Sequence, residues 1–249
     1  MSVSIHKLVD GPAVATRAAA DFVAWAQSAL SQKDLLHVSV TGGTVGILTL
    51  VKIAEHPLVQ ELDWARIHIW WGDERFVAAN SPDRNSLQAR DALLGKINIP
   101  ESNIHEFPSL QDKGASAQQQ LSEAARAFDK VIDGFVAEPG TQLAFDLTFL
   151  GMGPDGHIAS LFPERELPAG GVRVLAEADS PKPPPMRLTF TYEAICNSKL
   201  IWFVVAGADK ADAVSVALSD DPTRLPVGRV AGLDQTVWYL DEAAASKIS

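Results

Sequence analysis

The chain has 249 residues, of which 47% are hydrophobic and 21% are charged, and its formal net charge is −10 with no cluster of Lys or Arg. This composition is typical of a globular enzyme and argues against a nucleic-acid partner. The single cysteine, Cys196, excludes an internal disulfide and favours a reducing, cytoplasmic location, and because no run of 18 apolar residues is present, we expect no membrane partner.

Helix and strand patterns alternate along the chain. In chain order, the expected elements are a helix over 13–32, a strand over 35–40, a helix over 45–56, a strand over 66–71, helices over 83–95 and 115–136, strands over 143–150, 187–195 and 199–207, a helix over 208–219 and a last strand over 236–240. Residues 163–187, with PKPPP at 181–185, are expected to form a surface loop.

The alternation predicts a single α/β domain over residues 1–249, with a doubly wound, mostly parallel sheet flanked by helices. The near-continuous apolar run LAFDLTFL at 143–150 fits a strand that is buried on both faces of such a sheet. Ligands of these sheets bind outside the carboxyl ends of the strands. Four expected strands end in TGGT, GDER, GMGPDGH and GADK, so we expect these turns to form one site.

The turn GMGPDGHIASLFP at 151–163 fits two interpretations. Its Gly-x-Gly-x-x-Gly pattern is found in dinucleotide-binding turns, but only about six residues separate Gly156 from Pro163, too few for the crossover helix of that fold. Alternatively, the glycines permit an unusual backbone path that presents Asp155 and His157, whose imidazole suits proton transfer near neutral pH. A purely structural histidine, or a metal held by this pair, is also open at this point.

The turn GDER places Asp73, Glu74 and Arg75 between Trp71 and Phe76. Three charges in a row are usually a solvated loop, but the aromatic neighbours indicate that these are partly enclosed. Arg75 offers a planar fork to a carboxylate or phosphate, and Asp73 or Glu74 could orient that fork or bind sugar hydroxyls.

The remaining two turns are candidates for binding an anion. In TGGT, Gly42, Gly43 and Thr44 would leave backbone N–H groups bare at a helix N-terminus, although a tight turn with Thr44 as the N-cap explains the pattern equally well. Lys210 stands at the start of the helix after GADK, and Arg187 opens RLTFT; each is a candidate phosphate ligand or a plain surface cation. No Gly-x-Ser-x-Gly elbow is present, and Cys196 lies in a strand-like run.

Taken together, TGGT, WWGDERFV, GMGPDGHIASLFP, RLTFT and VAGADKADAV, in this order over nearly the whole chain, resemble the 6-phosphogluconolactonases, which are related to the glucosamine-6-phosphate deaminases. The resemblance implies hydrolysis of 6-phospho-D-glucono-1,5-lactone without metal or organic cofactor. It implies that His157 is the general base and that Arg75 and Lys210 hold the substrate, with Lys210, and more weakly Arg187, at the phosphate. Asp155 would hold the tautomer of the imidazole or stabilise the turn.

Two alternatives to a lactonase stay open. The loop of the amino-sugar-phosphate deaminases and isomerases is similar. The deaminase loop, however, carries a Glu five residues after the His, where this chain has Phe162. A sugar-phosphate-binding regulator without activity would need Arg75 and Lys210 but not His157. The sequence also departs from the lactonase pattern at two places, Val45 after TGGT and DRNS after GDER. These departures affect the expected contacts with the sugar but not the expected chemistry.

Two properties of the expected enzyme are left undecided by the sequence. Backbone N–H groups of residues 151–157 are candidate donors to the oxyanion of the reaction, but the sequence does not place them. The oligomeric state, a monomer or a weak dimer, is equally undecided. The expected partner is a small sugar-phosphate lactone.

Overall fold

The computed structural model describes residues 2–112, 114–165 and 171–248. Its α-helices are α1 (Gly11–Leu30), α2 (Gly43–Ala54), α3 (Asn85–Ala92), α4 (Ala117–Asp133), α5 (Tyr192–Cys196) and α6 (Ala211–Ala217). Its strands are β1 (Ser2–Leu8), β2 (Leu36–Val40), β3 (Ile67–Trp71), β4 (Asp73–Arg75), β5 (Phe145–Leu150), β6 (Val174–Glu177), β7 (Arg187–Phe190), β8 (Ser198–Val205) and β9 (Gln235–Asp241). No helix of the described residues is long and apolar enough to cross a membrane.

The larger sheet is parallel throughout, with the strand order β1-β9-β8-β5-β2-β3, and helices flank it, which confirms the predicted fold class. From β2 the chain proceeds to β3 on one side, whereas from β5 it proceeds through β8 to β9 on the other. The direction of winding therefore reverses between β2 and β5. At such a point the connections leave a crevice at the carboxyl ends of the strands, where ligands of open α/β sheets bind.

A second, antiparallel sheet of order β4-β7-β6 stands beside the first and is not predicted by the sequence. Its strand β6 lies within residues 163–187, so the predicted surface loop is wrong for Val174–Glu177; residues 166–170 of that stretch lie outside the described residues. Strands of three or four residues are too short to show a period of two, which is why the sequence did not reveal this sheet. Through β4 and β7, the small sheet positions Arg75 and Arg187.

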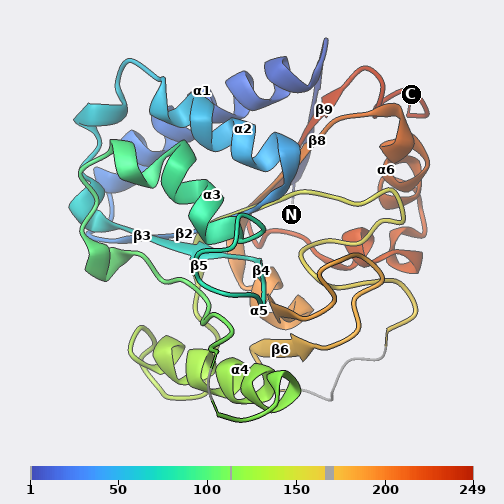
Figure 1. The fold of residues 1–249 in the computed structure, drawn as a ribbon. Helices are drawn as coiled ribbons and strands as arrows, with labels where there is room; N and C mark the ends of the chain where they lie inside the picture. Colours follow the sequence, from blue (N-terminus) through green and yellow to red (C-terminus); the bar gives the residue numbers. More distant parts are fainter. Residues whose placement is uncertain (1, 113, 166–170, 249) are drawn as a thin grey trace.

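Figure 1 shows α1, α2 and α3 packed together along the larger sheet, and α4 against β6 of the smaller one. Helix α1 begins where the carboxylate of Asp10 accepts a hydrogen bond from the backbone N–H of Ala13, with a proline in the first turn. Phe22 of α1 is 2% exposed and contacts Trp64 and Phe149. Burial of such a side chain contributes about 2–3 kcal/mol, which holds the helix on the sheet.

Several predicted elements have different bounds. The strand predicted over 187–195 ends at Phe190, and α5 follows because the hydroxyl of Thr191 caps it; Cys196 therefore ends a helix rather than lying in a strand. The last helix is also shorter than predicted, since a 3-10 turn over Ala208–Lys210 precedes the seven residues of α6. Strand β1 is not predicted by the sequence because it is an edge strand in which no residue is buried.

Candidate active site

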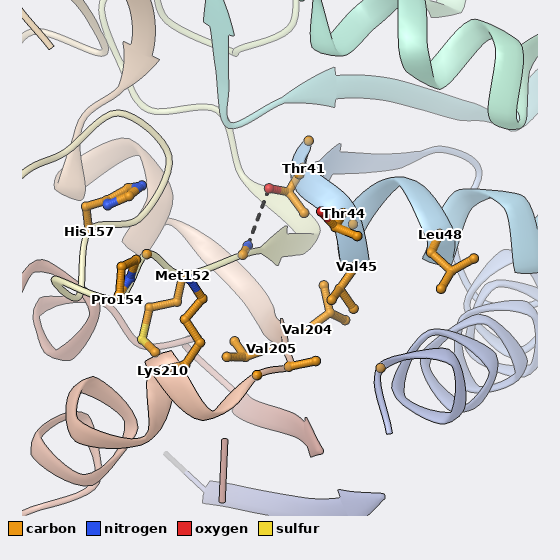
Figure 2. A pocket seen from close by; sticks show the side chains of 18 of the residues that line it. Thr41, Thr44, Val45, Leu48, Met152, Pro154, His157, Val204, Val205 and Lys210 are labelled. Atoms are coloured by element: carbon orange, nitrogen blue, oxygen red, sulfur yellow. Dashed lines mark hydrogen bonds between the residues drawn. The ribbon is translucent and has the colours of Figure 1, made fainter. Parts of the chain in front are cut away.

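A cavity of about 740 Å³ opens at the carboxyl ends of β2, β5, β8 and β9. All four turns that the sequence singles out meet in its wall, with residues 41–46, Asp73 and Arg75, residues 151–154 and His157, and Gly207, Asp209 and Lys210. Figure 2 shows His157 and Lys210 on one side of the cavity and Thr44, Val45 and Leu48, from the start of α2, on the other. The cavity thus lies at the point where the winding reverses.

His157 and Asp155 form a close pair in the turn after β5. The His157 side chain is 17% exposed, and its Nδ1 lies 2.5 Å from Oδ1 of Asp155. Burial lowers the pKa of His157, although the hydrogen bond and charge of Asp155 act in the opposite direction, so the imidazole is neutral at pH 7. With Nδ1 donating to the carboxylate, Nε2 is the nitrogen that can accept a proton. Asp155 does not line the cavity and reaches it through His157.

The carboxylate of Asp155 stays ionised in this setting. Burial opposes its ionisation, but the hydrogen bond from His157, the charge that His157 carries when it is protonated in acid, and the charge of Lys182 together outweigh it, so the pKa of Asp155 falls below its usual value. An ionised acceptor on Nδ1 fixes the tautomer of His157 and would stabilise an imidazolium. The pair has the arrangement of a general base with its orienting carboxylate.

The glycines of this turn are required by the position of the imidazole. A Cβ on Gly153 would lie 2.0 Å from both Cε1 and Nδ1 of His157, so only glycine leaves room for the ring. Gly156 has φ +76°, in the left-handed region that favours glycine. The ring of Phe162 packs against that of His157, with 4.9 Å between ring centroids. The turn thus brings His157 to the cavity, as predicted, whereas the prediction that it also presents Asp155 there is wrong.

Asp73 and Arg187 form a buried pair on the small sheet. The Asp73 carboxylate accepts a hydrogen bond from the Ser160 hydroxyl at 2.6 Å, and Nη1 of Arg187 lies 3.8 Å from the same Oδ2. Arg187 donates its Nε to the carbonyl of Pro184 and its Nη2 to that of Lys182. Nε and Nη2 of Arg187 are therefore engaged within the protein, and burial lowers its pKa.

Arg75 and its neighbour Glu74 point to different places. Nη1 of Arg75 donates to the carbonyl of Asp83 at 2.7 Å and to Oδ1 of Asn85 at 2.8 Å, and both Arg75 and Asn85 line the cavity. Glu74 is 1% exposed and accepts hydrogen bonds from backbone N–H groups, including those of Asn85 and Ser86 at the start of α3. The structure does not bring Glu74 to the cavity; it fixes α3 against β4.

Lys210 lines the cavity on the same side as His157, and its Nζ lies 2.9 Å from Oδ2 of Asp209 (Figure 2). The turn before it is held by Asp241, whose carboxylate accepts from the backbone N–H of Gly207 at 3.0 Å. On the other side, α2 begins at Gly43 with no side-chain cap. The alternative in which Thr44 is the N-cap is therefore wrong, and the first N–H groups of α2 lie at the cavity wall.

Backbone N–H groups of residues 151–157 are largely engaged inside the turn. Gly151 donates to the Thr41 hydroxyl (dashed in Figure 2), Gly153 to the carbonyl of His157, and Gly156 to that of Gly153. These N–H groups, which the sequence analysis names as candidates, are therefore poor candidates for the oxyanion donors. The unpaired N–H groups at the start of α2 and the cations of the wall are better placed.

Among the residues of the cavity wall that the sequence-based prediction misses are three polar ones, Asn85, Lys182 and Asp241. Asn85 lies in DRNS, which differs from the lactonase pattern, and Lys182 lies in the stretch that the sequence predicts to be a loop. A lysine in a proline-rich stretch directly before RLTFT was the available signal. No group of three or more His, Cys, Asp or Glu side chains that could hold a metal occurs among the residues described.

The model of the family described as glucosamine-6-phosphate isomerases/6-phosphogluconolactonase matches residues 10–238. The chain belongs to this family. A 6-phosphogluconolactonase of Mycobacterium leprae is 38% identical over 250 residues, which cover 100% of this chain and 99% of that protein. The solved structure of a 6-phosphogluconolactonase from Thermotoga maritima matches with a TM-score of 0.79 at 27% identity, covering 96% of this chain and 100% of the other. The solved structure of a 6-phosphogluconolactonase from Trypanosoma brucei, at 24% identity, shares the fold with a TM-score of 0.85. The match covers 100% of this chain and 99% of the other.

Proposed function

We propose that this chain hydrolyses 6-phospho-D-glucono-1,5-lactone to 6-phosphogluconate, the second step of the oxidative pentose phosphate pathway. Membership of the family and the names of the full-length relatives support this activity. One observation carries it at the level of chemistry: a neutral imidazole, oriented by an ionised carboxylate, lines a cavity with cations in its wall. We also propose that the enzyme acts in the cytoplasm, because a phosphorylated sugar is retained inside the cell.

The reaction needs a base, an oxyanion site and a proton donor, and His157 serves in two of these roles. Its Nε2 takes a proton from the water that attacks the lactone carbonyl carbon, and Asp155 stabilises the imidazolium that results. Negative charge develops on the carbonyl oxygen, for which the N–H groups of α2 and nearby cations are the donors. When the ring bond between the carbonyl carbon and the ring oxygen breaks, His157 returns the proton to that oxygen.

Local cations have to recognise the phosphate, because a chain of net charge −10 does not attract an anion through its overall field. Four basic and three acidic side chains of the described residues line the cavity: Arg75, Lys182, Arg187 and Lys210, and Asp73, Asp209 and Asp241. Lys210 is the first candidate, because among the described residues only the exposed carboxylate of Asp209 engages its ammonium. Arg75 follows, and Arg187 ranks third because backbone carbonyls occupy its donors.

The position five residues after His157 favours a lactonase over a deaminase. Related deaminases carry a glutamate there, which ring opening and proton shuttling need. Phe162 is 4% exposed and packs its ring against the imidazole, so no carboxylate is available at this position. A regulator that only binds sugar phosphates would have no use for the His157–Asp155 pair.

A coupled assay tests the proposed activity. Freshly made phosphorylated lactone is supplied, and the product is followed with a dehydrogenase that consumes 6-phosphogluconate. We expect a rate above spontaneous hydrolysis that rises in proportion to the enzyme. A rate equal to the spontaneous one would contradict the proposal, and release of ammonia from glucosamine 6-phosphate would instead favour the deaminase.

A further inference from the structure

A loop over residues 180–185 brings an additional charge to the catalytic pair. Nζ of Lys182 lies 3.8 Å from Oδ1 of Asp155, the same oxygen that lies 2.5 Å from Nδ1 of His157. Lys182 also lines the cavity, and its side chain is 43% exposed. The ammonium and the imidazole thus lie near the same carboxylate oxygen, and both line the cavity.

The position of this loop is set by Arg187. Its guanidinium donates to three successive carbonyls, those of Lys182 at 3.1 Å, Pro183 at 3.3 Å and Pro184 at 2.8 Å. The hydroxyl of Ser180 donates to the carbonyl of Lys182 at 3.1 Å and closes the loop on itself. Since Arg187 is 6% exposed and starts β7, it ties the loop to the small sheet.

We propose that Lys182, held in place by Arg187, is a positioning residue of the reaction that acts through the His157–Asp155 pair, by placing a positive charge on the carboxylate that orients the imidazole. This proposal rests on the proposed lactone hydrolysis. It assigns Arg187 a new role as the clamp of the Lys182 loop rather than the main phosphate ligand. It also separates Lys182 from Lys210, whose ammonium lies beside Asp209 instead.

The charge of Lys182 has a defined effect on the base. Burial is the largest cause of the lowered pKa of His157, and the hydrogen bond and charge of Asp155 act against it. The charge of Lys182 lowers this pKa further, whereas the negative charge of Asp73 raises it. The other charged side chains of the cavity wall are Arg75, Arg187, Asp209, Lys210 and Asp241. Lys182 therefore adds to the effect of burial, which favours the neutral imidazole at mildly acidic pH, and makes the imidazole a somewhat weaker base.

Removal of the charge should change the pH profile in a characteristic way. In Lys182→Met, the acid limb of kcat/KM is expected to move to higher pH, because His157 then protonates more easily. The loss is expected to be about two- to fivefold near pH 6, because Lys182 is partly exposed, and to vanish by about pH 8.5, where a more basic imidazole matches or exceeds the wild type. Lys182→Arg should restore the wild-type profile. A change in folding alone would lower activity at every pH.

The experiment measures kcat/KM against pH for wild type, Lys182→Met, Lys182→Arg and a control, Lys247→Met, which removes an exposed lysine that also pairs with an aspartate. In parallel, NMR follows the titration of the His157 imidazole in each protein, a readout that does not depend on lactonase activity. Salt of about 0.5 M should move the wild-type midpoint toward that of Lys182→Met, since it screens a partly exposed charge.

Two results would overturn the proposal. One is an unchanged His157 midpoint in Lys182→Met, whether or not the KM for the phosphorylated lactone rises; a rise would make Lys182 a phosphate ligand. The other is an equal loss of activity at all pH values that Lys182→Arg does not restore. If the wild type fails to accelerate hydrolysis, the proposed function fails, and the NMR midpoints still test the effect of Lys182.

Discussion

The two ends of the larger sheet each carry histidines, with different surroundings. At the carboxyl end, His157 faces a cavity and bonds to a carboxylate. Near the amino end, His37 of β2 and His68 of β3 are paired across the strands, and Nδ1 of His68 lies 2.8 Å from Nε2 of His105. The His105 ring stacks on Trp70 with 3.9 Å between centroids. These three histidines are called the histidine triad below.

Both groups are held neutral by burial, yet only one is equipped for proton transfer. In the triad, burial lowers the pKa of His105 to about 3, and the neighbouring imidazoles add a smaller effect in the same direction. Burial likewise lowers the pKa of His37 to about 4. The nearby carboxylate of Asp146 is engaged by Lys33 and Lys199 instead of an imidazole. A neutral histidine therefore becomes a base only where a carboxylate can stabilise its charged form and a substrate can reach it.

The largest expected effect comes from removing the imidazole of the cavity. His157→Ala should lower kcat by a factor on the order of 10²–10⁴, the usual contribution of a general base, with the fold intact. The coupled assay and a far-UV spectrum measure this. The matched variant in the triad, His105→Phe, should leave kcat at pH 7 within about twofold of the wild type. A folded His157→Ala enzyme with near-normal turnover would refute the assignment.

The next largest effect concerns the phosphate at the carboxyl end. A charge-assisted contact is worth about 1.5–3 kcal/mol, so Lys210→Ala should raise the KM for the phosphorylated lactone roughly ten- to a hundredfold. It should change the slower hydrolysis of unphosphorylated gluconolactone little, and Lys247→Ala serves as the control. Equal weakening of both substrates would exclude Lys210 as the phosphate ligand and make Arg75 the leading candidate.

The triad is expected to affect stability rather than rate. Its folded pKa values lie below the unfolded value of 6.5, so the unfolded chain binds more protons in acid. The contribution of these histidines to the free energy of unfolding is fully present above about pH 6.5 and is lost as the pH falls toward 4. At pH 5, His37 and His105 each lower the free energy of unfolding by about 2 kcal/mol relative to neutral pH. Urea unfolding at pH 7 and 5 measures it, and His105→Phe should reduce the difference. Equal wild-type stability at both pH values would be contrary to this prediction.

The smallest expected effect is that of a chelator. Nδ1 of His157 is already bonded to Asp155, and the mechanism uses no ion, so prolonged chelator treatment should leave kcat unchanged in the coupled assay. A loss of activity that zinc or magnesium restores would favour the metal alternative for this pair.

Most of the larger sheet could be predicted because its central strands are buried on both faces, as in β5, where all six residues are buried. The turns after these strands were predictable as one site because parallel strands bring their carboxyl ends together at one edge of the sheet. The small sheet was not predictable, because β4 consists of Asp73, Glu74 and Arg75, whose pairing with β7 depends on the backbone. The direction of the Glu74 side chain and the reach of Lys182 also depend on tertiary packing. That the chain is a single domain stays a prediction.

The central claim, that neutral His157 is the base of the reaction, is tested most directly by two pH titrations of the wild type. NMR gives the protonation midpoint of His157, assigned with the His157→Ala variant, and the assay gives the acid limb of kcat/KM, which reports groups of the free enzyme. We predict one common midpoint below the usual 6.5, because burial lowers the pKa of His157. Activity that persists at pH values where His157 is fully protonated would contradict the account.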